Sequence, residues 1–169
     1  SGACESPADL ISSIQGAGLS SPLLGQMVTV EAVVVADAVD GLGGVFVQAQ
    51  QPDRDGDPMT SEGLFVQIDG ARPNVERGDV VRVQGRVAEL GEGNSTLTAL
   101  VELSSFQFCG KVDELPQASL IEEPPLVADD WEIHEGMRLA IEPAATVLAN
   151  YALLSRGELL VGLQGRQWI

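Results

Sequence analysis

Aromatic side chains are scarce in this chain: Phe, Trp and Tyr together make up 4% of 169 residues, although 44% are hydrophobic. A core built from this composition must be mostly aliphatic. The apolar runs are short and the chain contains 19 glycines, which favours many short strands over long helices. None of these runs approaches the ~18 apolar residues that a membrane-spanning helix needs.

Positive charge is the second shortage. The chain has 9 Lys and Arg residues against 25 Asp and Glu, a formal net charge of -16, and Lys111 is its one lysine. Such a surface repels phosphate, and counterion release gives it no general affinity for nucleic acid. The same charge opposes binding to anionic membranes and keeps a protein soluble.

Histidine and cysteine are nearly absent as well. His134 is the single histidine, and no convincing nucleophile, acid–base pair or complete metal constellation accompanies it in the sequence. We therefore expect this chain to have no catalytic activity of its own. The two cysteines, Cys4 and Cys109, are compatible with one disulfide in an oxidising compartment or with two free thiols in a reducing one.

Alternation of apolar and polar residues predicts five strands with tight turns and no crossover helices between them. Five antiparallel strands of this size are typical of a small closed barrel. In the fourth strand, Gly85 marks a possible bend for barrel closure. Before the strands, Ser6 as N-cap, Pro7 at the first turn and Gly16 as terminator predict one short helix. The five predicted strands span residues 27–37, 45–50, 64–69, 80–90 and 96–108.

Three regions follow from this pattern. Residues 1–110 hold the helix and the barrel. Residues 111–130 are rich in proline and carboxylates, which predicts an extended linker. Residues 131–169 predict two or three further strands, a smaller C-terminal β segment that is too short to bury a core alone. It either packs on the barrel or begins a further module.

Several stretches, in order, resemble the OB-fold domain that secreted bacterial nucleases join to a DNase I-like endonuclease/exonuclease/phosphatase domain. The most specific is "DGDPMTSEGLFV" at 55–66, placed between two similar strands. After the linker, two shorter stretches resemble the segment that follows the OB domain in that family. The stretches that carry the resemblance are "LISSIQGAGLSSPLLGQMVTVEAVVVAD", "GVFVQ", "DGDPMTSEGLFV", "GDVVRVQGRVAELGE", "WEIHEGMRLAI" and "NYALLSRGEL".

The resemblance implies a mainly β chain with a five-stranded OB-fold barrel, from a bacterial protein that is secreted, periplasmic or held at the cell surface. No stretch corresponds to the nuclease catalytic motifs, so the chain resembles the accessory part of such an enzyme. Two functions follow. The module binds DNA and positions it for an adjoining nuclease catalytic domain, or it is a structural domain that packs on that catalytic domain without binding DNA. We expect a monomer without a membrane span.

The phrase F-V-Q occurs twice and indicates where a ligand would bind. Alternation places the aliphatic residues of both strands inward and the phenylalanines and glutamines outward, on the face that OB folds use for ligands. Aromatics there stack on bases. The alternative is that a helix, a loop or the C-terminal segment covers the phenylalanines, and that the arginines pair with nearby acids. The candidate nucleic-acid-binding residues are Phe46, Gln48, Gln50, Phe65, Gln67, Arg82 and Arg86.

The loop between the two F-V-Q strands carries four carboxylates: Asp53, Asp55, Asp57 and Glu62. Three carboxylates at alternate positions are typical of calcium loops, although the glycine comes too early for an EF-hand. The loop is therefore a candidate Ca²⁺ or Mg²⁺ site. The alternative is a solvated turn in which Asp and Gly suit the backbone.

We expect Cys4 and Cys109 to form a disulfide that ties the N-terminal segment to the end of the fifth strand. A loop of this length contributes roughly 4–5 kcal/mol in the chain-entropy model. Free thiols, or lipid attachment at Cys4 because "SGAC" resembles a lipobox, are the alternatives.

Overall fold

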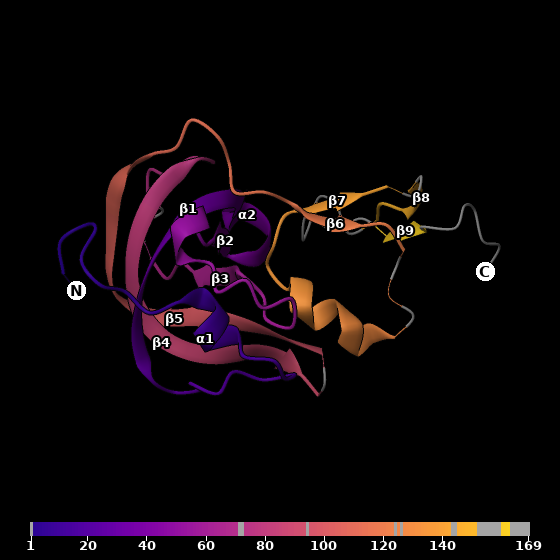
Figure 1. Ribbon diagram of the computed structural model, residues 1–169, viewed down its shortest axis with the longest axis horizontal. Helices are drawn as coiled ribbons and strands as arrows, with labels where there is room; N and C mark the ends of the chain where they lie inside the picture. Colours follow the sequence, from indigo (N-terminus) through magenta and orange to yellow (C-terminus); the bar gives the residue numbers. More distant parts are fainter. Residues whose placement is uncertain are drawn as a thin grey trace.

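The computed structural model describes residues 2–70, 73–93, 95–123, 125, 127–142, 145–151 and 160–162, which are mainly β (Figure 1). A five-stranded sheet forms the larger body, and short strands and a 3₁₀ helix lie beside it. The elements are α1 (Ile11–Gln15), β1 (Met27–Ala38), α2 (Val39–Leu42), β2 (Gly44–Gln48), η1 (Gln51–Asp53), β3 (Gly63–Gln67), β4 (Asp79–Glu92), β5 (Ser95–Lys111), β6 (Ser119–Ile121), η2 (Ala128–His134), β7 (Leu139–Ile141), β8 (Thr146–Ala149) and β9 (Leu160–Gly162).

The five long strands form a closed sheet in the order β1-β2-β3-β5-β4, with β4 returning to pair with β1. All five strands lie where the sequence predicts them, to within three residues at each end. One pairing differs from the antiparallel prediction, because β3 and β5 run parallel, with Val66 opposite Leu100. Parallel neighbours need a long connection, and here the connection is the antiparallel strand β4.

Aliphatic side chains from every strand fill the interior. Val30, Val47, Val66 and Val83 are 0–1% exposed, and α1 adds Ile14 to the same cluster. These are the inward positions that alternation predicts, so the strand faces are confirmed. A chain with few aromatics thus builds its core from branched aliphatic residues, which suit the pleated surface of a sheet.

The N-terminal helix is shorter than predicted and begins at Ile11, with no side-chain cap on Leu10. Ser6 is not its N-cap. The carbonyl oxygens of Ser6 and Pro7 instead accept hydrogen bonds from the Arg82 guanidinium, 2.8 Å each. A long-range contact to β4 therefore holds this segment extended, which the local capping pattern could not reveal.

Gly85 marks the bend that the sequence predicts. The register between β4 and β5 shifts between Gln84 and Arg86, and a Cβ at Gly85 would lie 2.7 Å from Cδ2 of Leu103 and 2.9 Å from the Val101 carbonyl oxygen. A bulge of this kind increases the local bend of a strand. No other residue type fits at this position without movement of β5.

The predicted linker contains structure. Its residues 119–121 form β6, which pairs in parallel with β7, and η2 begins at Ala128. β8 and β9 form a second two-stranded sheet. Figure 1 shows these elements on the side of the barrel that carries β2 and β3. Most of the stretch "NYALLSRGEL" and residues 163–169 lie outside the described residues.

Candidate functional site

The two phenylalanines of the F-V-Q phrases face each other across β2 and β3. Phe46 is the register partner of Phe65, and their ring centroids lie 4.9 Å apart at an interplanar angle of 54°. Phe65 is 1% exposed and Phe46 is half-buried. The Phe65 ring lies over Gly44, where a Cβ would come within 2.5 Å of its Cζ. Phe65 therefore offers no face for stacking, and Phe46 offers part of one.

Gln48 is fully buried, although alternation places it on the outer face. Its Nε2 donates to the carbonyl oxygen of Gln117 at 2.9 Å, and its Oε1 accepts from the backbone N–H of Arg138 at 3.1 Å. Arg138 in turn donates through Nη1 to the Pro116 carbonyl oxygen at 2.7 Å. The amide that could read a base edge instead joins the barrel to two segments of its own chain.

A close backbone approach lies next to Gln48. Gly63 begins β3, and a Cβ there would lie 2.3 Å from the Gly136 carbonyl carbon and 2.5 Å from Met137 N. Ser61 donates through Oγ to the Glu135 carbonyl oxygen at 2.6 Å. Residues 135–138 thus lie directly on the outer face of β2 and β3, where only glycine at position 63 permits this contact.

Gln50 and Gln67 remain half-exposed. Gln50 lines an open groove of about 610 Å³ between the end of β2 and residues 112–117, together with Val33, Pro52 and Leu115. Gln67 makes one long hydrogen bond, 3.4 Å, to Asp69. With Phe46, these are the accessible members of the predicted set on the two strands.

The two arginines do not form a phosphate-binding strip. Arg82 is 2% exposed and pairs with Glu31 at 3.0 Å. Arg86 pairs with Glu102 at 2.8 Å and donates to the Gly25 carbonyl oxygen. Each guanidinium pairs with a carboxylate of a neighbouring strand. The alternative interpretation expects such pairing, but with Glu76, Asp79 or Glu89 and not with these partners.

The acidic loop folds around its own backbone. Asp55 Oδ1 accepts from Asp57 N–H at 2.8 Å, Asp57 Oδ1 accepts from Met59 N–H at 2.9 Å, and Glu62 Oε1 accepts from Asp55 N–H at 3.0 Å. The first two are Asx-turn hydrogen bonds, and the third ties the start of the loop to the residue before β3. Within the described residues, the four carboxylates Asp53, Asp55, Asp57 and Glu62 do not converge as one metal-ligating group.

A second carboxylate group, absent from the sequence predictions, lies where η2 meets the barrel. Glu135 Oε1 accepts from Thr98 N–H at 2.8 Å and from Gln15 Nε2 at 3.3 Å. Burial, together with the negative charges of Glu132 and Glu89, raises the pKa of Glu135 to about 7. Burial also raises the pKa of Glu132. The motif "WEIHEG" supplies Glu132 itself, but it gives no signal of the burial, because Thr98, Gln15 and Glu89 are remote in sequence.

His134 is the last residue of η2 and directly precedes Glu135. Its Nδ1 lies 3.0 Å from Ser119 Oγ, and its ring lies edge-on to Trp131 at 6.4 Å. Burial lowers the pKa of His134. The histidine is thus part of the contact between η2 and β6, and its surroundings are those of a packed interface residue.

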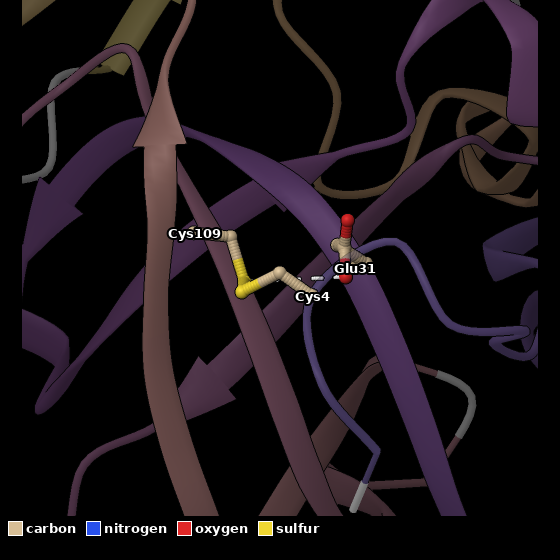
Figure 2. Close-up of side chains that lie close together, drawn as sticks. All are labelled: Cys4, Glu31 and Cys109. Atoms are coloured by element: carbon tan, nitrogen blue, oxygen red, sulfur yellow. Dashed lines mark hydrogen bonds between the residues drawn. A yellow bond between two sulfur atoms is a disulfide. The ribbon is translucent and has the colours of Figure 1, made fainter.

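Cys4 and Cys109 form the predicted disulfide, with their Cα atoms 5.5 Å apart (Figure 2). The bond fixes the N-terminal segment to β5 beside Glu31 of β1. Among the described residues, Cys4, Glu31 and Cys109 are the one group of three potential metal ligands that lie close together. Since the two sulfurs are bonded to each other, neither is a thiolate, and the group is structural in this form.

The described helices include none that is long and apolar enough to cross a membrane. No family model, no curated protein and no solved structure matches the chain.

Proposed function

We propose that the barrel is an OB fold and that the chain is an accessory module of a secreted nuclease. The strand order β1-β2-β3-β5-β4 and the parallel β3–β5 pairing support the fold assignment, since the OB fold is a five-stranded Greek-key barrel. The nuclease context rests on the resemblance of the sequence stretches. The disulfide is compatible with an extracellular location.

Within that context, the module acts as a non-catalytic docking domain that packs against the adjoining catalytic domain. The occupied outer face of β2 and β3 is the observation that carries this conclusion. Gln48 and Gly63 hold residues 135–138 of the same chain in the position where other OB folds hold their ligands. Because the chain's own backbone covers this face, it offers DNA no open platform, and a net charge of -16 disfavours a polyanionic partner. Both points favour a protein as the partner.

DNA binding is the second candidate, and the half-buried Phe46 favours it. Phe46 and Gln67 are both half-buried, on the neighbouring strands β2 and β3, and one aromatic residue contributes roughly 1–3 kcal/mol when a base stacks on it. Without Phe65, Arg82 or Arg86 to assist, we expect such binding to be weak and restricted to single strands.

A titration of labelled single- and double-stranded oligonucleotides, followed by fluorescence anisotropy at low salt with and without Ca²⁺, separates the two functions. The docking function predicts no saturable change with either ligand. Saturable binding that Phe46→Ala abolishes would refute it and establish the second candidate. A parallel calorimetric titration with the nuclease catalytic domain should show binding, and its absence would leave the docking function without support.

A further inference from the structure

Two carboxyl groups meet at Thr98, where the end of η2 contacts the barrel. Glu135 Oε1 accepts from the Thr98 N–H at 2.8 Å, and Glu89 Oε1 accepts from Thr98 Oγ1 at 3.0 Å. The Ser21 N–H also donates to Glu89 Oε1, at 2.8 Å. Glu89 belongs to β4 of the barrel, whereas Glu135 belongs to the segment that covers it. The two acidic groups therefore bind one residue of β5 from the two partners of this contact.

The donors at this contact are all neutral. Besides Thr98, Glu135 accepts from Gln15 Nε2 at 3.3 Å. Within the described residues, neither Glu89 nor Glu135 forms a salt bridge. Oε2 of Glu89 is buried and has no hydrogen-bond partner there. A second negative charge would thus be desolvated beside the first without compensation, which favours the protonated form of one carboxyl group.

Glu135 is the group that holds this proton. Burial and the negative charges of Glu132 and Glu89 raise the pKa of Glu135 from 4.5 to about 7. Below this pH the neutral carboxyl group suits the contact. Above it both carboxyl groups are ionised, and their repulsion acts between the covering segment and the barrel.

The other titratable groups of η2 act in two directions. Burial and the charges of Glu89 and Asp129 raise the pKa of Glu132, so Glu132 adds to the effect of Glu135. Burial lowers the pKa of His134, so its titration favours the packed form as pH rises. A loosening of the contact at higher pH therefore identifies the carboxyl groups and not the histidine.

We propose that loss of the proton from Glu135, beside the charge of Glu89, releases η2 and residues 135–138 from the barrel. The carboxyl pair thus acts as a pH-dependent closure of the outer face of β2 and β3. This inference goes beyond the proposed docking function, because it concerns the covering segment alone and its test needs no partner.

Release would uncover the face on which OB folds hold their ligands. The segment is held there by the Arg138 N–H, which donates to Gln48 Oε1, and by Ser61 Oγ, which donates to the Glu135 carbonyl oxygen. When these contacts open, the Gln48 amide and the backbone at Gly63 become available to another molecule. A molecule that needs this face would therefore bind more tightly at pH 8 than at pH 5.

Amide hydrogen exchange of the disulfide-intact chain at pH 5 and pH 8 tests the release. Each rate is compared with that of an unfolded chain at the same pH, which removes the intrinsic pH dependence of exchange. The Arg138 N–H reports on the covering segment, and the Val87 N–H, which donates to the Gln26 carbonyl oxygen at 2.9 Å, reports on the barrel. We expect the protection of Arg138 to fall about ten- to thirtyfold from pH 5 to pH 8. It should stay at least about tenfold below that of Val87 at both values.

Two variants assign the effect to the carboxyl pair. Glu135→Gln keeps an oxygen for the Thr98 N–H but has no charge, so the protection of Arg138 should fall by less than about threefold. Glu89→Gln removes the neighbouring charge and should also reduce the fall. The control Glu102→Gln, exposed on β5, should behave as the native chain.

Three results would overturn the proposal. One is a native chain in which the protection of Arg138 does not fall between the two pH values. Another is a fall of native size in Glu135→Gln. The third is equal protection of Arg138 and Val87, which would show that the segment leaves only when the whole barrel unfolds.

Discussion

Replacing Glu135 with glutamine should make the stability of the protein less sensitive to pH. Burial raises the pKa of Glu135 from 4.5 to about 7, so the folded state holds the proton over a range of pH in which the unfolded state has lost it. The folded state therefore binds more protons, and the free energy of unfolding falls as pH rises from 4.5 to 7. Glutamine has no such proton, so the variant lacks this contribution.

The magnitude follows from the pKa difference. A pKa of about 7 in the folded state against 4.5 in the unfolded state corresponds to a change of about 3 kcal/mol in the free energy of unfolding if no solvent screening applies. Because Glu135 is half-buried and water screens part of the interaction, we expect about 1–2 kcal/mol. Relative to the native chain, Glu135→Gln should therefore gain about 1–2 kcal/mol between pH 5 and pH 8.

Urea unfolding at the two pH values measures this gain directly. Glu102→Gln is the control, because Glu102 is 66% exposed on β5 and its ion pair contributes little. Its stability relative to the native chain should differ by less than about 0.5 kcal/mol between the two pH values. A Glu135→Gln variant that shows no relative gain at pH 8, or that loses stability there, would refute the buried position of this carboxylate at the contact between η2 and the barrel.

Three further outcomes follow from the packing. Gly63→Ala places a Cβ 2.3 Å from the Gly136 backbone and should lower the free energy of unfolding by about 1–3 kcal/mol in urea. The control Gly18→Ala, with open space around it, should be nearly neutral. Equal effects of the two substitutions would contradict the close contact at Gly63. Phe65→Ala should cost about 3–5 kcal/mol, and a small loss would show that the ring is exposed. Reducing the disulfide, which links residues 105 apart, should cost about 4–5 kcal/mol by the same assay, and unchanged stability would show that the bond is not formed.

The sequence predicts the strands and the interior because these depend on local alternation. Val47 and Val66 occupy inward positions in any barrel built from these segments, and both are fully buried. Gly85 could be assigned to a bend because a lone glycine in the interior of a strand often marks a bulge or a tight turn of a barrel. The disulfide was predictable because the chain holds only two cysteines.

The outer face could not be predicted in the same way. Alternation places Gln48 and Phe65 outside but does not reveal what lies above them, and the covering residues, Gln117 and Arg138, are 69 and 90 positions from Gln48. The same limitation applies to Arg82. Its strand position indicates a surface residue, whereas contacts to Glu31 and to the N-terminal segment bury it.

The parallel pairing of β3 with β5 and the buried Glu135 were missed for a related reason. β5 runs parallel to β3 because β4 lies between β5 and β1 in the closed sheet. The alternation of apolar and polar residues does not encode which strands become neighbours. Glu135 has an ordinary polar context in sequence. Its pKa is raised by burial and by the charges of Glu132 and Glu89, against the lowering effect of the hydrogen bond from Thr98 N–H. Long-range contacts between regular elements therefore decide which of the predicted site residues are accessible.

Residues 135–138 lie on the outer face of β2 and β3, and amide hydrogen exchange of Arg138 and Thr98 tests this contact most directly. The N–H of Arg138 donates to Gln48 Oε1 on β2, and the N–H of Thr98 on β5 donates to Glu135 Oε1. We expect both amides to exchange at least about a hundredfold more slowly than in an unfolded chain, and Gln48→Ala to remove the protection of Arg138. Exchange of both amides at the unfolded rate, with β2 and β3 still protected, would show that the face is open.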